Sequence, residues 1–119
     1  MCRQLVLLLA IVLLFLVDMV GWATDLLCVA GLAAGVFVFD VTNPAQPTII
    51  GRVDTRKAAM VFWKGSYVYV ADDVNGLLII DLSMPQEPVV VARWHKDGGK
   101  ANAVDVVGHY AYIADENHG

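Results

Sequence analysis

The chain has 119 residues, of which 58% are hydrophobic and 17% charged, with a formal net charge of −4. This length allows one modest domain and excludes two, and the apolar share is above that of an average soluble protein. With residues 1–23 set aside, seven basic residues stand against eleven acidic ones. That balance offers no basic surface, so we expect no nucleic-acid partner.

The segment 1–23 has the layout of a secretory signal peptide. Arg3 precedes an unbroken apolar run at 5–17, which ends before Asp18, and Gly21 and Ala23 are small residues suited to a cleavage site. The apolar run fits the hydrophobic region of a signal and is shorter than the roughly 20 residues that cross a bilayer as a helix. We therefore expect an N-terminal hydrophobic signal helix at 1–23. An uncleaved membrane anchor and a buried core segment are the alternatives.

The remaining chain repeats itself. The phrase "GVFVFDVTNPAQP" from Gly35 returns as "GLLIIDLSMPQEP" from Gly76. A second phrase, "VFWKGSYVYVADDVNG" from Val61, returns at a slightly longer interval as "VDVVGHYAYIADENHG" from Val104, and "LLCVAGLAAG" from Leu26 is a weaker copy of its second half. Periods of about 20 to 50 residues are typical of solenoids and propellers. The two extra residues fall in the polar stretch "HKDGGKAN", which we interpret as a loop.

Each period predicts four short strands rich in β-branched and aromatic residues. In the best copy these are 59–64, 67–72, 77–82 and 88–94. Gly65-Ser66 and Gly108-His109 suit type II′ turns, which join antiparallel neighbours. Cys28, alone once the signal is removed, is interpreted as a small apolar residue in a strand.

The segments "LLIIDL" and "VVVARW" do not alternate polar with apolar residues. Both faces of such a sheet must be covered, and here only other sheets can cover them. Four-stranded antiparallel units at a period of about 41 to 43 residues describe β-propeller blades, and an open sandwich is the alternative. We expect an all-β, incomplete propeller over 26–119 with one complete blade at about 59–94.

The phrases "GVFVFDVTNP" and "GLLIIDLSMP", each paired with "YVYVADD" or "YAYIADE", resemble LVIVD repeats. These are β-propeller repeats of bacterial and archaeal cell-surface proteins. The resemblance covers the chain from Leu26 to Gly119 and implies fold and location, with no catalytic residue. Met84, where the family usually has Asn or a similar turn residue, and "DTRKAA", in place of a Pro-Gly turn, depart from the family pattern.

Propellers close with about four to eight blades, and this chain stops where another repeat phrase is due. We therefore expect the N-terminal fragment of a longer protein. A truncated, non-functional gene is the alternative.

Charged residues are expected on one rim, because loops leaving the outer strand and loops between the second and third strands of a blade share that rim. The candidate ligand residues there are Arg56, Lys57, Asp72, Asp73, Lys96, Asp97, Lys100, Asp115 and Glu116. An ordinary solvated face is the alternative. Asp105, an acid at the inner-strand position that Phe62 holds in the other copy, is a candidate for the central channel.

No stretch spells out a catalytic or metal site, so we expect no cofactor. "ADDVNG" fails as a calcium loop because Ala71 has no ligand oxygen at the first position. The histidines are scattered, and Asp40 and Asp81 are interpreted as hydrogen-bond acceptors in turns.

These observations predict an exported, non-enzymatic scaffold or binding module. Its partner would be a protein or carbohydrate at the cell surface, and it would touch the membrane only through an uncleaved N-terminal segment. An extracytoplasmic hydrolase or lyase with its site in the central funnel is the alternative.

Overall fold

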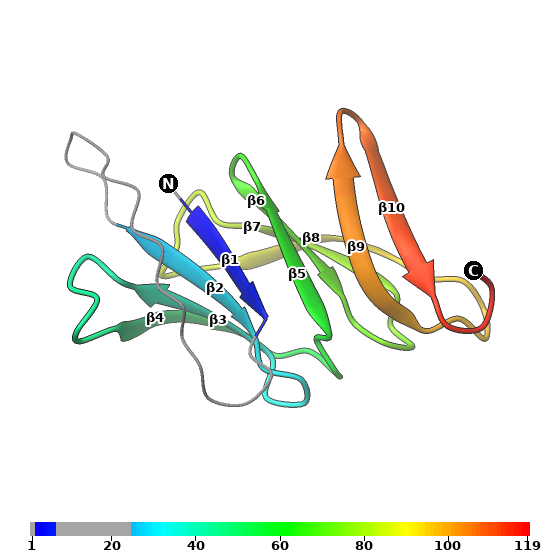
Figure 1. Cartoon of the computed structure of the whole chain (residues 1–119), viewed down its shortest axis with the longest axis horizontal. Helices are drawn as coiled ribbons and strands as arrows, with labels where there is room; N and C mark the ends of the chain where they lie inside the picture. Colours follow the sequence, from blue (N-terminus) through cyan, green and yellow to red (C-terminus); the bar gives the residue numbers. More distant parts are fainter. Residues whose placement is uncertain (1, 7–24) are drawn as a thin grey trace.

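The computed structural model describes residues 2–6 and 25–119, and every regular element in them is a β-strand (Figure 1). The strands are β1 (Cys2–Val6), β2 (Leu26–Ala30), β3 (Val36–Asp40), β4 (Thr48–Val53), β5 (Met60–Lys64), β6 (Tyr67–Ala71), β7 (Leu77–Asp81), β8 (Val89–Trp94), β9 (Ala101–Val107) and β10 (Tyr110–Asp115). They form a first sheet in the order β1-β2-β3-β4, a middle sheet β5-β6-β7-β8 and a third sheet β9-β10. The described part of the chain is therefore all-β, as expected.

The strands of the middle sheet begin and end within one residue of the predicted ones and pair antiparallel in chain order. The turns after β5 and β9 have a positive φ at Gly65 (61°) and Gly108 (58°), and the residues that follow them do not. This is the type II′ geometry predicted from the sequence.

The repeat extends to irregularities of the sheets. The register of β3 and β4 shifts between Val38 and Phe39, and that of β7 and β8 shifts between Ile79 and Ile80. Val38 and Ile79 are both the fourth residue of the first repeated phrase, so the two shifts occupy equivalent positions. The first and middle sheets are thus copies of one unit.

The three sheets follow one another along the long axis of the molecule and pack face to face (Figure 1). One face of the middle sheet, with Val61, Val68, Val70, Leu78 and Ile80, packs against Cys28, Ala30, Val36 and Val38 of the first sheet. Its other face, with Ala71 and Leu77, packs against Ala101, Val104 and Val106 of the third. Strands β6 and β7 of the middle sheet are mostly buried, between the first and third sheets, which is the arrangement of neighbouring propeller blades in an incomplete, propeller-like stack. β8 is mostly exposed, so the cover expected on both faces of "VVVARW" is not found among the described residues, because the two-stranded third sheet does not reach over it.

Tyr69 of β6 and Cys28 of β2 contribute to this packing. Tyr69 is partly buried in the cluster between the middle and third sheets. Cys28 is fully buried in β2, as expected of a small apolar strand residue.

Most of the expected signal segment, residues 7–23, lies outside the described residues. The described part, Cys2–Val6, is the strand β1 and not a helix, and it pairs parallel with β2 from Cys2↔Leu26 to Val6↔Ala30. It lies where β5 lies in the middle sheet, although β5 pairs antiparallel with β6. An open edge of β2 offers backbone partners to any extended segment, which explains the strand. No helix capable of spanning a membrane occurs among the described residues.

The backbone conformation requires glycine at the first position of both copies of the first repeated phrase. Gly35 and Gly76 have φ values of 95° and 74°, a region that L side chains rarely adopt. A Cβ on Gly35 would meet the carbonyl oxygen of Val53, and a Cβ on Gly76 would meet that of Trp94. The turn into the third strand therefore passes directly beside the end of the fourth.

We expect Gly76→Ala to lower the free energy of unfolding by about 3 kcal/mol, because a strained φ and a clash with the end of β8 act together. Gly65→Ala is the matched control, since Gly65 has a φ of 61° but nothing within 4 Å of an added Cβ. The control should lose only about 1 kcal/mol. Urea unfolding followed by circular dichroism measures both, and equal losses would contradict the close approach of β7 and β8.

Candidate functional site

Loops at one end of the three sheets are joined to one another by backbone hydrogen bonds. Leu32, after β2, exchanges hydrogen bonds of 3.1 and 3.2 Å with Ala58, before β5. Asp73, after β6, exchanges hydrogen bonds of 3.1 and 2.9 Å with Ala101, at the start of β9. Loops within sheets and loops between sheets therefore lie together, and we call this end the charged rim.

Asp72 anchors the loop that enters the middle sheet. Its carboxylate is buried and accepts hydrogen bonds from the backbone N–H groups of Arg56 (3.2 Å) and Lys57 (2.6 Å) and from Asn75 Nδ2 (2.8 Å). Amide donors satisfy a carboxylate without any paired cation, and hydrogen bonds to a charged acceptor are stronger than neutral ones. Asp72 therefore holds the loop in place.

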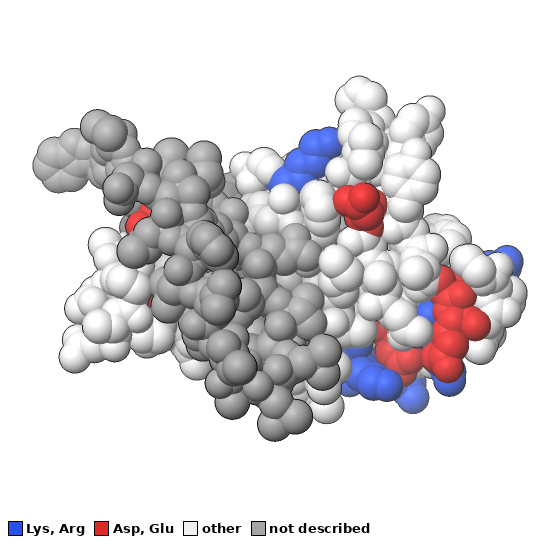
Figure 2. Space-filling model, in the orientation of Figure 1, with Lys and Arg blue, Asp and Glu red and all other residues white. Residues whose placement is uncertain are grey.

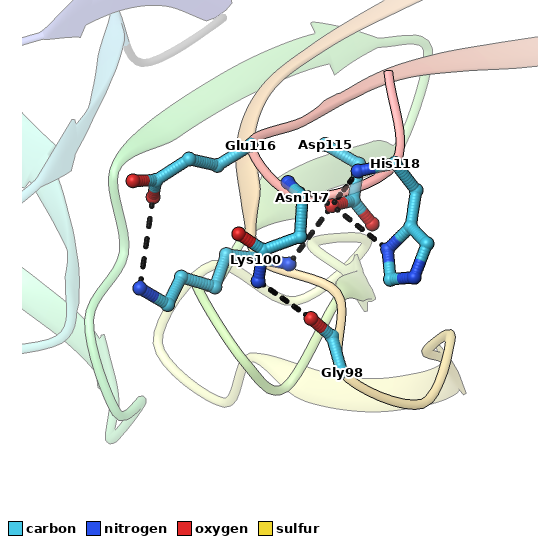
Figure 3. Close-up of polar contacts among 6 residues, drawn as sticks. All are labelled: Gly98, Lys100, Asp115, Glu116, Asn117 and His118. Carbon is cyan, nitrogen blue, oxygen red and sulfur yellow. Dashed lines mark hydrogen bonds and ion pairs between the residues drawn. The ribbon is translucent and has the colours of Figure 1, made fainter.

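Asp115 does the same for the loop that enters the third sheet (Figure 3). Its carboxylate accepts hydrogen bonds from the backbone N–H groups of Lys100 (3.1 Å), Asn117 (2.9 Å) and His118 (3.2 Å). The Lys100 amide is the main cause that lowers the pKa of this carboxyl, with further contributions from Asn117 and His118. Asp72 and Asp115 occupy equivalent positions of the second repeated phrase, so the anchor is part of the repeat.

By sequence, the loop-anchoring aspartates Asp72 and Asp115 count among the ligand candidates of the rim. In the structure their carboxylates instead accept hydrogen bonds from backbone N–H groups of loops on the same rim. The signal that was missed is the common spacing of 15 residues between Lys57 and Asp72 and between Lys100 and Asp115. In the first sheet Gly31 stands at the equivalent position, so no carboxylate is available there.

The other predicted rim residues lie on the anchored loops. The side chains of Arg56, Lys57, Lys96 and Asp97 are exposed. Of these four, Asp97 alone lies within ion-pair distance of a partner in the described part of the chain, and that partner is the imidazole of His95. Figure 2 shows charged groups of both signs gathered at this end of the molecule.

Ion pairs and an amide contact organise the third-sheet side of the rim. Lys100 Nζ lies 3.9 Å from Glu116 Oε2 (Figure 3), and His95 Nε2 lies 3.6 Å from Asp97 Oδ1. Asn117 Nδ2 donates to the Gly98 carbonyl oxygen at 2.6 Å, which ties the loop before β9 to the loop after β10. The exposed pairs add little stability, so the loop is held mainly by its amide contacts.

Acids at the opposite end have a structural role. Asp40 Oδ1 accepts a hydrogen bond from the Thr42 amide at 2.9 Å, and Asp81 Oδ1 accepts from the Ser83 amide (2.7 Å) and hydroxyl (2.6 Å). The hydroxyl and amide groups of Thr42 and Ser83 lower the pKa of Asp40 and Asp81. The prediction that these aspartates are acceptors in turns is confirmed.

Asp105 lies on a groove beside the inner strands β5 and β9. The groove has a volume of about 500 Å³, and its other lining residues are Met60, Phe62, Ala103, Val104, Tyr112, Ile113 and Ala114. Asp105 is exposed, and its carboxylate accepts a hydrogen bond of 2.9 Å from the backbone N–H of the neighbouring Val106. The structure thus places one acid in a mostly apolar groove.

The "ADDVNG" segment forms a tight turn. Asn75 N–H donates to the Asp72 carbonyl oxygen (2.9 Å), and Gly76 N–H donates to that of Asp73 (3.0 Å). Asp73 itself has a φ of 49°, which an Asp tolerates better than most residues. Within residues 25–119, no group of three His, Cys, Asp or Glu side chains is placed to hold a metal ion.

A match to a known repeat family agrees with the division into sheets. The LVIVD repeat model matches residues 24–55, 56–95 and 98–119. The chain belongs to the LVIVD-repeat family. The three matched stretches contain β2–β4, β5–β8 and β9–β10, so each LVIVD repeat corresponds to one sheet. Neither a curated protein nor a solved structure matches the chain significantly.

We expect Asp72→Asn to lower the free energy of unfolding by about 2 to 3 kcal/mol, because the charged acceptor is lost and an amide donor would face the N–H groups of Arg56 and Lys57. Asp73→Asn is the matched control, since the structure shows no hydrogen bond to the Asp73 carboxylate from any described residue and Asn also tolerates a positive φ. Thermal and urea unfolding of both variants provide the measurement. If the two variants were equally stable, the anchoring role of Asp72 would be wrong.

Proposed function

We propose that this LVIVD-repeat chain is part of an exported β-propeller that binds a protein or carbohydrate ligand at the cell surface through its charged rim. The observation that carries the proposal is the pair of loop-anchoring aspartates. Asp72 and Asp115 hold successive rim loops through backbone amides, while side chains on those loops remain exposed. Loops fixed on a rigid scaffold are the usual place for binding residues.

The anchors favour binding because the loops are ordered before a ligand arrives. Binding costs free energy whenever a loop or side chain must be immobilised, and preorganisation reduces that cost. The exposed side chains of Arg56, Lys57, Lys96 and Asp97 carry both signs of charge. A polar ligand with hydroxyl, carboxylate or amide groups fits this surface better than an apolar one.

A binding role agrees with the chemistry of the acids better than an enzymatic role. The carboxylates of Asp72 and Asp115 are occupied by several N–H donors each, which leaves them poorly suited to transfer protons. Asp105 faces a groove whose other lining residues are apolar except for Tyr112. A hydrolase or lyase needs convergent groups, and this groove supplies a single carboxylate.

The rim proposal is tested with the purified chain on an array of bacterial and archaeal cell-surface polysaccharides and extracellular proteins. For a ligand so found, the triple variant Arg56→Ala, Lys57→Ala, Lys96→Ala should weaken binding about tenfold or more, since several exposed charges are removed together. Glu87→Ala, on the opposite end, is the control and should bind as the parent does. Loss of binding in Asp105→Asn with full binding by the rim variant would place the ligand in the groove and refute the rim.

Export is tested by fusing residues 1–23 to an alkaline phosphatase that is active only outside the bacterial cytoplasm. We expect activity from the fusion, because the apolar run has the length of a signal's hydrophobic region. Leu8→Arg with Leu13→Arg interrupts that run and should abolish the activity. Equal activity of both fusions, or none from the parent, would count against export.

A further inference from the structure

β10 is the outer strand of the third sheet, and its free edge corresponds to the edge of β6 that pairs with β7 in the middle sheet. β6 pairs with β5 on one side and β7 on the other, whereas β10, its counterpart, pairs with β9 and with no second strand among residues 2–6 and 25–119. Tyr110 and Tyr112 on β10 are 70% and 60% exposed. Such an edge is a template for an added strand.

The middle sheet carries an exposed tryptophan next to this edge. Trp94, at the end of β8, is 54% exposed, whereas Val53, at the same position of the first sheet, is 9% exposed. Val53 belongs to the cluster that contains Leu78 and Ile80 of β7, with Val90 of β8 packed against it. Third and fourth strands beside β10 would cover Trp94 in the same way. A single element, a two-stranded hairpin, would cover both the edge of β10 and the exposed indole of Trp94.

The direction of the backbone groups on β10 follows from the middle sheet. Asp72 N–H donates to the Gly76 carbonyl oxygen and Leu82 N–H to that of Ser66, each at 2.8 Å. Because hydrogen-bonded pairs alternate along antiparallel strands, Val68 and Val70 direct their backbone groups toward β7. Their equivalents in the second copy are Ala111 and Ile113, whose N–H groups accordingly point away from β9. β10 thus presents donors at alternate residues along its free edge.

We propose that this edge binds a β-hairpin of LVIVD-repeat sequence, with a Gly-x-x-x-x-Asp strand antiparallel to β10 and the returning strand over Trp94. The pairs Tyr67↔Asp81, Tyr69↔Ile79 and Ala71↔Leu77 in the middle sheet set the register. Accordingly, Tyr110 lies opposite the Asp of the bound strand, Tyr112 opposite its third apolar residue and Ala114 opposite its first. Binding at this edge is independent of the ligand proposed for the rim.

The probe is a synthetic peptide of residues 35–53, "GVFVFDVTNPAQPTIIGRV", which contains a complete hairpin sequence and no tryptophan. The full chain with Trp22→Phe and Trp63→Phe reports on Trp94 alone. We expect a saturable blue shift of Trp94 emission on addition of the peptide and none with a scrambled peptide. Absence of the shift would overturn the proposal.

Ala111→Pro removes an outward N–H and leaves the pairing with β9, so it should weaken peptide binding at least tenfold, whereas Ala111→Val should bind as the parent does. The same strand pairing is tested without altering the chain by methylating the peptide nitrogens of Phe37 and Phe39, which pair with β2 in the first sheet. This removes the peptide donors to the carbonyl oxygens of β10, and the same loss is expected. Unchanged binding in both tests would refute edge pairing. Sedimentation as a dimer that excludes the peptide would identify a second copy as the occupant and also refute the hairpin.

Discussion

A sheet that is apolar on both faces can be stable in water only between two other sheets, and the whole structure depends on this constraint. Leu78 and Ile80 of β7 face the first sheet, while Leu77 and Ile79 face the third. Burial of this kind contributes roughly 25 cal/mol per Å² of apolar surface, so separation of the sheets would be costly on either side. The stacking places the turns of the described strands at two ends of the molecule.

The charged rim shows how an insertion in one copy of the repeat is accommodated. The segment between the end of β8 and Lys100 is two residues longer than the segment between the end of β4 and Lys57, yet each lysine amide meets an aspartate of its own sheet. The extra length is taken up near Gly98 and Gly99, and a Cβ on Gly99 would meet the Asp115 carboxylate. Glycine there allows the loop to pass beside its anchor, so the repeat keeps the anchor and varies the remainder.

Much of the fold could be predicted because periodicity reports packing directly. The strand bounds, the type II′ turns and the double-sided burial of β7 all follow from repeated patterns of side chains. The burial of Asp72 was not predicted, because its partners are backbone N–H groups, whose only sign in the sequence is the 15-residue spacing that Lys57 and Asp72 share with Lys100 and Asp115. Nor was β1, since its parallel pairing depends on the edge of β2 and not on any pattern in Cys2–Val6.

The anchors also separate the requirements of folding from those of recognition. Asp72 and Asp115 contact the main-chain N–H groups of Lys57 and Lys100, so the loops are held whatever side chains those positions carry. Residues exposed on the rim can then change without loss of the loop conformation, as long as the position is not proline. A repeat built in this way can present many different surfaces on one scaffold, so the repeat sequence specifies an architecture, and under the proposed binding role the ligand would be selected by a few exposed side chains.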